Sequence, residues 1–274
     1  MGIPNDTKVE KYMSSLGTIL ITGSNRGIGL EFVKQYSSRN WDVIATCRNT
    51  SQAEELIELS KNHDNLGLMN LDITNQESVQ EVANKLDGKP IDILINNAAY
   101  LGAPDPQKFG QIDYSMFTES FEVNAIGPIR ITETLIENVR ESNMKKIIFL
   151  GSGAGSITQI APPVTLYSYR ASKAALHLAV NNLYYELRPE NIIVSLINPG
   201  MVDTRGFLGL KLGDPIPEHL TKMVPVALIK MIQEGKIPMI TTLESVQNMM
   251  KYIDQLSINT KPLFVNCDGT PMPW

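Results

Sequence analysis

The sequence predicts an α/β fold, a single doubly wound domain in which about seven parallel strands are covered by helices on both faces. Short apolar runs rich in β-branched residues alternate along the chain with longer amphipathic segments. A glycine-rich turn joins the first run to the first amphipathic segment, and polar residues recur where later runs end. With 274 residues and 43% hydrophobic content the chain can bury one substantial core, so we expect one domain over residues 1–274.

The alternation of runs also sets the expected order of elements. In such a sheet, ligands bind at the carboxyl ends of the strands, where the motifs described below fall. We expect strands at 18–22, 41–47, 66–71, 91–95, 146–151, 191–197 and 262–266, and helices at 27–39, 51–62, 75–86, 113–142, 167–187 and 244–256.

The turn after the first strand has the composition of a phosphate cradle. Its glycines are spaced Gly-x3-Gly-x-Gly, which permits a tight turn and a close approach of phosphate to the backbone. Backbone N–H groups and the start of the next helix would then face a dinucleotide pyrophosphate. The alternative is an ordinary flexible surface turn. The residues expected to bind the cofactor here are Gly23, Ser24, Asn25, Arg26, Gly27, Ile28 and Gly29.

The end of the second strand indicates which dinucleotide is preferred. Sites for NAD usually place an acidic residue there to hold the ribose 2′-hydroxyl, but residues 45–48 contain no Asp or Glu. Arg48 stands there instead, and Arg26 adds a second guanidinium that suits phosphate oxygens. We therefore expect NADP(H), the alternative being two ordinary solvated arginines.

Tyr169 and Lys173 lie four residues apart in a segment expected to be helical, so their side chains should share one face. An ammonium beside a phenol favours the phenolate, and we expect Lys173 to lower the pKa of Tyr169. A phenol tuned in this way can exchange a proton with a carbonyl or alcohol oxygen. The pair alone is a weak signal, because this spacing also arises by chance on solvated helices.

Taken in order, the motifs resemble those of the short-chain dehydrogenase/reductase family over nearly the whole chain, and within it the carbonyl reductases of the Sniffer and C-factor group. This implies a Rossmann-type domain. The run 167–176 and the final residues 268–274 carry the closer resemblance. The motifs are the glycine turn, Leu71-Asp72-Ile73-Thr74, Asn96-Asn97-Ala98-Ala99, Asn124, Ser152, Tyr169-x3-Lys173 and Pro199-Gly200-x3-Thr204.

The resemblance implies an NADPH-dependent reduction of a carbonyl, or the reverse oxidation of an alcohol. Tyr169 would donate the proton, and Ser152 would donate a hydrogen bond to the substrate oxygen. Lys173 would also bind the nicotinamide ribose, and Asn124 would hold a water that relays protons. The alternative for Asn124 is a polar residue that only kinks its helix. The alternative for the protein is an NADP-binding signalling or regulatory role of the C-factor type, with little catalysis.

Further cofactor contacts are implied by the same resemblance. Asp72 would accept a hydrogen bond from the adenine amino group beside Ile73, or it could cap the helix at 75–86. Asn97 and Ala98 would line the adenosine ribose. The residues expected to face the nicotinamide and phosphates are Pro199, Gly200, Val202 and Thr204.

Two departures from the family pattern bear on the site. Ala99 stands where the family usually has glycine, and we expect only a slight adjustment from its methyl group. Ser152 lies 17 residues before Tyr169, farther than usual, so a longer loop at 156–166, with Pro162 and Pro163, would reshape the substrate mouth.

Residues 205–240 form an apolar-rich insertion, which we expect to be a substrate lid selecting a hydrophobic ketone, aldehyde or alcohol. An oligomer contact is the equal alternative. By analogy with the family, helices 113–142 and 167–187 would form a homodimer or homotetramer.

Composition excludes several other classes. The net charge of −5 argues against nucleic-acid and anionic-membrane partners, and no apolar run is long enough to predict a transmembrane helix. Cys47 and Cys267 are too few for a disulfide framework, and His63, His177 and His219 show no metal spacing. The simplest expectation is a cytoplasmic protein that holds no metal.

Overall fold

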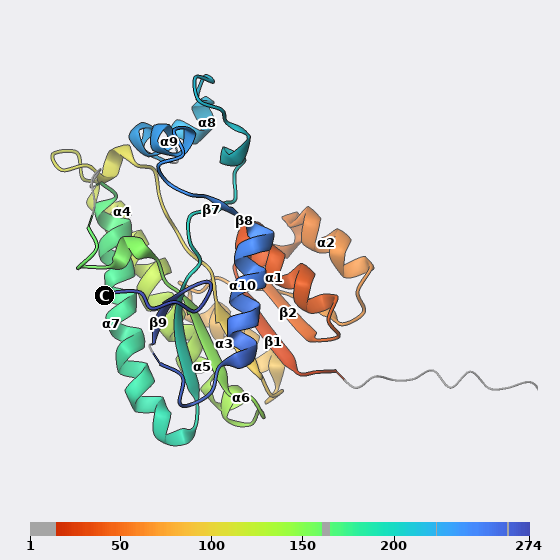
Figure 1. The fold of residues 1–274 in the computed structure, drawn as a ribbon. Coiled ribbons are helices and arrows are strands. Elements are labelled where there is room, and N and C mark those ends of the chain that lie inside the picture. Colours follow the sequence, from red (N-terminus) through yellow and green to blue (C-terminus); the bar gives the residue numbers. More distant parts are fainter. Residues whose placement is uncertain (1–14, 161–164, 223, 262) are drawn as a thin grey trace, which may run out of the picture.

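The computed structural model describes residues 15–160, 165–222, 224–261 and 263–274. Its main sheet has seven strands, all parallel, in the order β3-β2-β1-β4-β5-β6-β9 (Figure 1). The predicted doubly wound α/β fold is therefore confirmed. The strands are β1 (Thr18–Thr22), β2 (Asp42–Cys47), β3 (Leu66–Asn70), β4 (Ile93–Asn96), β5 (Lys146–Leu150), β6 (Ile193–Asn198) and β9 (Phe264–Asn266).

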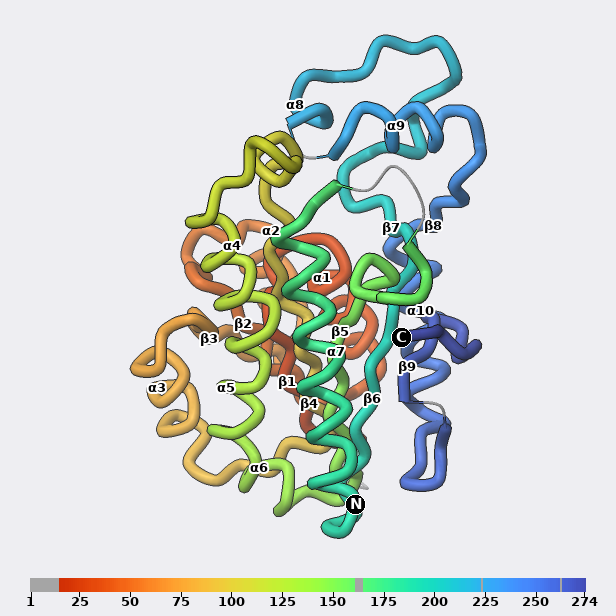
Figure 2. Tube along the Cα trace, turned by 90° about the vertical axis from the view of Figure 1, so that its left-hand side faces the viewer, coloured from red at the N-terminus to blue at the C-terminus, as the bar shows by residue number. Residues whose placement is uncertain are grey.

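Helices cover both faces of this sheet (Figures 1 and 2). Helices α1, α2 and α10 pack on one face, and α3, α5 and α7 pack on the other. The helices are α1 (Gly27–Ser37), α2 (Glu54–Lys61), α3 (Gln76–Leu86), α4 (Tyr114–Phe121), α5 (Gly127–Thr134), α6 (Ile136–Arg140), α7 (Tyr167–Leu187), α8 (Glu218–Thr221), α9 (Val226–Gln233) and α10 (Thr242–Gln255).

The alternation of side chains along each strand produces two separate cores. In β1, Ile19 and Ile21 point to the face covered by α1 and α10, whereas Leu20 points to the opposite face. All three are fully buried. A strand buried on both faces has to be apolar at every position, which is why these runs were recognisable in the sequence.

The single helix predicted at 113–142 is wrong in detail. The segment is divided into α4, a π-helical turn at Glu122–Ile126, α5 and α6. The break before α6 falls at Leu135, whose φ of −98° and ψ of 11° lie outside the helical range. A π turn widens the helix by one residue and is frequent at functional sites.

A second, two-stranded sheet was not predicted. β7 (Val202–Asp203) pairs in parallel with β8 (Ile240–Thr241). The chain between them, including α8 and α9, lies beyond one end of the main sheet (Figures 1 and 2). Its own small core contains Phe207, Leu220 and Ile229, so the insertion is a packed substructure rather than a loose loop.

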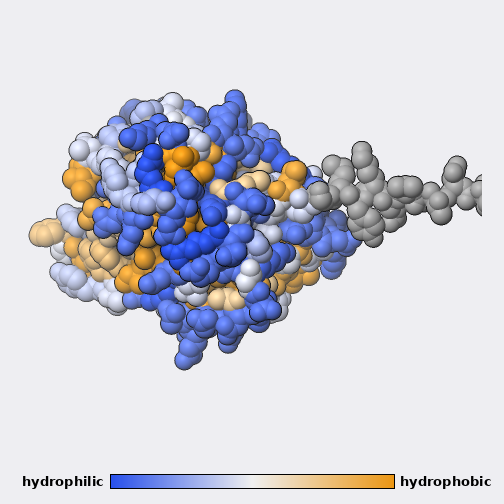
Figure 3. Space-filling view, turned by 90° about the horizontal axis from the view of Figure 1, so that it is seen from below, coloured by the Kyte–Doolittle hydropathy of each residue, from blue (hydrophilic) through white to orange (hydrophobic). Residues whose placement is uncertain are grey.

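The face of the molecule seen from below Figure 1 is mostly hydrophilic, with its hydrophobic residues in separate groups (Figure 3). Within the described residues, no helix is long and apolar enough to cross a membrane.

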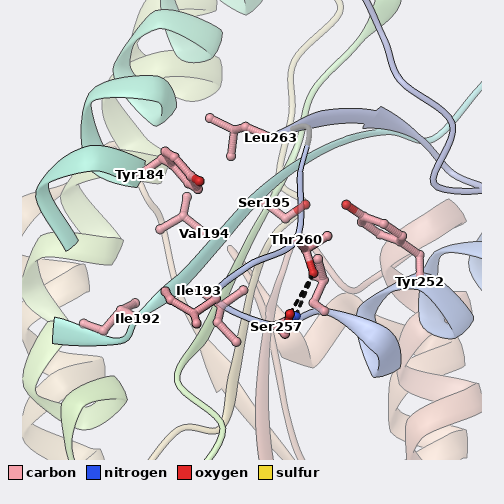
Figure 4. A pocket seen from close by; sticks show the side chains of 11 residues that line it. Tyr184, Ile192, Ile193, Val194, Ser195, Tyr252, Ser257, Thr260 and Leu263 are labelled. Carbon is pink, nitrogen blue, oxygen red and sulfur yellow. Dashed lines mark hydrogen bonds between the residues drawn. The ribbon is translucent and has the colours of Figure 1, made fainter. Parts of the chain in front are cut away.

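A small cavity lies between β6, the end of α7, and the C-terminal part of α10 with the loop that follows it (Figure 4). The hydroxyl groups of Ser195 and Tyr252 point toward one another across it (Figure 4). Its volume of about 10 Å³ suits roughly one water molecule. The cavity is therefore too small to be a substrate or coenzyme site.

Candidate active site

A large cleft of about 1350 Å³ opens where the parallel strands end. Its walls include the glycine turn, the ends of β2, β3 and β4, part of α4 and the base of the insertion. The predicted residues that line it are Gly23, Asn25, Arg26, Gly27, Ile28, Gly29, Arg48, Asp72, Ile73, Asn97, Ala98, Tyr169 and Thr204. The motifs at the ends of β1, β2, β3 and β4 thus share one cavity, whereas Ser24, Ser152 and Lys173 are not among the residues that line it.

The glycine turn has no room for side chains at the point where it approaches α1. A Cβ on Gly29 would lie 2.3 Å from the Gly23 carbonyl oxygen and 2.5 Å from the Asn97 side-chain nitrogen. Gly23 and Gly27 have φ values of +66° and +57°, which glycine adopts without strain. Helix α1 begins at Gly27, and no side chain caps its N-terminal N–H groups. These groups are free to bind an anion in the cleft.

Asn97 braces the glycine turn from the neighbouring strand. Its Nδ2 donates to the carbonyl oxygens of Thr22 and Gly23 at 2.8 and 2.9 Å. The hydroxyl of Thr22 in turn accepts hydrogen bonds from the backbone N–H groups of Asn97 and Ala98, each at 3.0 Å. Because its amide nitrogen is committed in this way, Asn97 holds the shape of the turn in addition to lining the cleft.

Three arginines line the cleft: Arg26, Arg48 and Arg205. Within the described part of the chain, no carboxylate forms an ion pair with any of them. Burial and the nearby charge of Arg26 both lower the pKa of Arg205. Guanidinium groups that line one cleft without a counterion suit the phosphates of a dinucleotide. Arg205 was missed in the sequence because it adjoins the motif ending at Thr204 without belonging to it.

Asp72 does not cap the following helix. Asn75 does so, accepting a hydrogen bond from the Ser78 backbone N–H at 2.8 Å. The Asp72 carboxylate instead accepts from the backbone N–H and the hydroxyl of Thr74 at 2.9 and 2.7 Å. Of the two roles expected from the sequence, the helix cap is excluded, and Asp72 remains at the cleft wall.

Of the three residues predicted to carry the chemistry, Tyr169 lies beside Ser152, and Lys173 contacts the end of the strand that precedes Ser152. Tyr169 and Lys173 lie in the first turns of α7, and the Tyr169 hydroxyl forms a hydrogen bond with Ser152. Lys173 is 3% exposed, and its Nζ donates to the Leu150 carbonyl oxygen at the end of β5 at 2.9 Å. Burial lowers the pKa of Lys173 to about 8.

The expected effect of Lys173 on Tyr169 is wrong. Burial raises the pKa of the Tyr169 phenol, and the opposing influence is its hydrogen bond with Ser152 rather than the lysine charge. The sequence showed the i, i+4 spacing but not that Lys173 is buried and that the surroundings of the Tyr169 phenol exclude water. A raised pKa keeps the phenol protonated at neutral pH, which is the state that a proton donor needs.

The loop that carries Ser152 is held by His177 and Asn198. The Ser152 backbone N–H donates to His177 Nε2 at 3.3 Å, and the Gly153 N–H donates to Asn198 Oδ1 at 3.1 Å. His177 is buried, and burial followed by the charge of Lys173 lowers its pKa to about 3. The imidazole is therefore a neutral acceptor, as expected for a packed histidine. The predicted Pro162 and Pro163 lie outside the described residues.

Asn124 is fully buried in the π-helical turn. Its side chain exchanges two hydrogen bonds of 2.7 Å with the backbone of Tyr100 and donates to the Ser172 hydroxyl at 3.0 Å. The π turn brings this amide between α7 and the wall segment that follows Asn97. Asn124 does not line the cleft, so its position supports a positioning role.

The last predicted segment lies at the base of the insertion. The Pro199 carbonyl oxygen accepts from the Ser245 hydroxyl at 2.7 Å, and Gly200 has a φ of +87°. Val202 is part of β7, and the methyl group of Thr204 lies close to Gly27. This segment therefore connects the glycine turn to the insertion. Pro199, Gly200 and Val202 do not themselves line the cleft.

Residues 17–210 match the family model of the short chain dehydrogenases. The chain belongs to this family of oxidoreductases. An uncharacterized oxidoreductase of Schizosaccharomyces pombe is 30% identical over 269 residues, covering 96% of this chain and 100% of the relative.

Two solved structures are similar to this protein. The NADPH-bound carbonyl reductase from chicken fatty liver has a TM-score of 0.76 at 28% identity, and it covers 94% of this chain and 98% of its own. The carbonyl reductase Sniffer of D. melanogaster has a TM-score of 0.73 at 26% identity, with 94% and 99% covered. The resemblance stated from the sequence motifs is confirmed.

Proposed function

We propose that this protein is an NADPH-dependent carbonyl reductase that reduces a ketone, aldehyde or quinone to the alcohol. The observation that carries the proposal is the pairing of a protonated, Ser152-bonded Tyr169 with a cleft that holds unpaired arginines. The similar chicken enzyme, whose structure holds NADPH, supports the choice of cofactor. Arg48 at the end of β2 would accept the 2′-phosphate, and the free N–H groups of α1 would bind the pyrophosphate.

NADPH supplies the hydride when bound, and the protein's own residues supply the rest. Ser152 donates a hydrogen bond to the substrate oxygen, and this bond stabilises the negative charge that develops there. Tyr169 delivers its phenolic proton to that oxygen. Lys173, charged below its pKa of about 8, would bind the nicotinamide ribose and holds the end of β5 through its hydrogen bond to Leu150. Asn124 holds the backbone of Tyr100 against α7 and so keeps the cleft wall in place.

The insertion at 205–240 would act as a substrate lid. Arg205 and Lys222 from this segment line the cleft. Their position supports the lid rather than the alternative, in which the segment would contact only a second subunit. Leu208 and Leu212 on the same segment are largely exposed, as is Phe109, whose ring contacts Tyr167 at the start of α7. None of these three lines the cleft itself, but Leu208 follows closely on Arg205, which does, and exposed apolar side chains on this segment favour a hydrophobic substrate.

The test is NADPH oxidation by the purified protein with a panel of quinones and aromatic aldehydes. Tyr169→Phe should lower kcat by roughly 10²–10⁴-fold, the usual contribution of a general acid, while NADPH binding persists. Tyr167→Phe is the matched control, because Tyr167 is an exposed tyrosine in the same helical turn. Turnover that survives Tyr169→Phe would contradict the proposal. NADPH binding with no turnover of any carbonyl would favour the non-catalytic regulatory role.

A further inference from the structure

Gln107 is a buried side chain behind the cleft wall, and both its amide nitrogen and its amide oxygen form hydrogen bonds. It lies at the end of a 3₁₀ turn, Asp105–Gln107, and is 1% exposed. Its Nε2 donates to the carbonyl oxygens of Leu101 and Ala103 at 2.7 and 2.9 Å. Its Oε1 accepts from the Ser168 hydroxyl at 2.6 Å and from the Tyr169 backbone N–H at 3.0 Å.

The orientation of this amide is fixed by its partners. The Tyr169 N–H can only donate and the two carbonyl oxygens can only accept, so the amide oxygen must face α7 and the amide nitrogen must face residues 101–103. With two bonds on each side, the side chain reaches its full hydrogen-bonding capacity. An apolar side chain of the same length would leave several buried polar groups without partners.

Helix α7 lacks a cap of its own. Leu166, at the N-cap position, has a left-handed backbone with φ of +64° and no side-chain oxygen to offer. A helix normally satisfies the N–H of its third residue with a Ser, Thr, Asp or Asn at this position. That third residue is Tyr169, and its N–H is satisfied by Gln107, 62 residues earlier in the chain.

We propose that Gln107 is a positioning residue that caps α7 from a distant loop and so fixes Tyr169 relative to residues 101–103. Those residues line the cleft together with Tyr169. One amide therefore sets the distance between the proton donor and the wall against which the substrate would lie. The inference rests on the proposed function, because Tyr169 has to act on that substrate.

Three variants test this role in the full chain. Gln107→Met removes all four hydrogen bonds and should lower kcat about 10-fold, as a sub-ångström displacement of the proton donor would. Its KM for NADPH should change less than twofold, because the glycine turn and Arg48 are untouched. Gln107→Glu keeps the acceptor for Tyr169 but loses the donors to residues 101–103. It should restore kcat and raise the KM for the carbonyl. Gln111→Met, at an exposed glutamine of the same loop, should change neither constant.

Hydrogen exchange at the Tyr169 amide gives a readout that needs no turnover. Exchange should accelerate in Gln107→Met and remain slow in Gln107→Glu. Two outcomes would overturn the inference: wild-type kcat with slow exchange in Gln107→Met, or a kcat loss in Gln107→Glu equal to that of Gln107→Met. If Gln107→Met does not fold, the glutamate variant and Ser168→Ala decide the question by the same two readouts. A wild-type protein that reduces no carbonyl would refute the proposed function, whereas the exchange data would still test the cap.

Discussion

Replacing Lys173 by methionine should make the protein more stable while removing its activity. Burial lowers the pKa of Lys173 from 10.5 to about 8, a difference of about 2.5 pH units. At 1.36 kcal/mol per unit, carrying the charge into the folded protein costs about 3.4 kcal/mol at neutral pH. The hydrogen bond to Leu150 returns roughly 1.5 kcal/mol of this. A methionine of similar length should therefore raise the free energy of unfolding by about 2 kcal/mol at pH 7.

The pH dependence of this difference identifies its cause. Because the folded-state pKa of Lys173 is the lower one, the unfolded chain binds more protons between pH 8 and 10.5, and the stability of the wild type rises through that window. The charge cost should fall from about 3.4 kcal/mol at pH 7 to about 1.4 kcal/mol at pH 9.5, so the advantage of the variant should vanish.

Urea unfolding of the wild type and Lys173→Met at pH 7 and pH 9.5 measures both values. Lys85→Met, the same substitution at an exposed lysine, serves as the control for the loss of one positive charge. A variant less stable than the wild type at pH 7, or a stability difference that does not change with pH, would refute the reasoning. The same ionisation should make turnover of the wild type decline as the pH rises through about 8.

Two further substitutions test the cofactor cleft by titration with NADPH. Arg48→Ala should weaken NADPH binding about 10-fold or more, the value of a charge-assisted hydrogen bond, and leave NADH binding unchanged; an equal loss for both cofactors would place Arg48 away from the 2′-phosphate. Gly29→Ala forces a methyl group to within 2.3 Å of the Gly23 carbonyl oxygen, so it should abolish NADPH binding and lower Tm by several degrees. Gly209→Ala, with nothing within 4 Å, should do neither, and unimpaired binding in Gly29→Ala would show that the turn can open.

The central strands of the main sheet could be predicted because they are apolar on both faces, as Ile19, Leu20 and Ile21 illustrate. The β7–β8 pair could not, since two residues per strand carry no periodicity. The π turn around Asn124 also escaped prediction. Its residues keep a helical pattern, and only the position of one extra residue distinguishes it from an α-helix.

The residues of the site likewise divide into those that short sequence motifs predict and those that only the folded structure reveals. Gly29, Asp72 and Tyr169 reach the cleft as predicted because they belong to short motifs at strand ends or helix starts. The contacts of Gln107 and Arg205 escaped prediction, because their partners are distant in the chain or their role depends on burial. The direction of the pKa shift of Tyr169 was missed for the second reason, since spacing along a helix does not reveal how much water surrounds it.

The short ladder between β7 and β8 joins the insertion to the domain at a single narrow base. Residues Val202 and Asp203 enter beside Ile240 and Thr241, so the chain leaves and returns at neighbouring points. The intervening residues pack on Phe207 and Ile229 rather than on the main sheet. Evolution can therefore lengthen, shorten or exchange this segment without moving the strands that carry the glycine turn. If the proposed lid role holds, the insertion is the part of the molecule best suited to diverge when a different substrate must be accommodated.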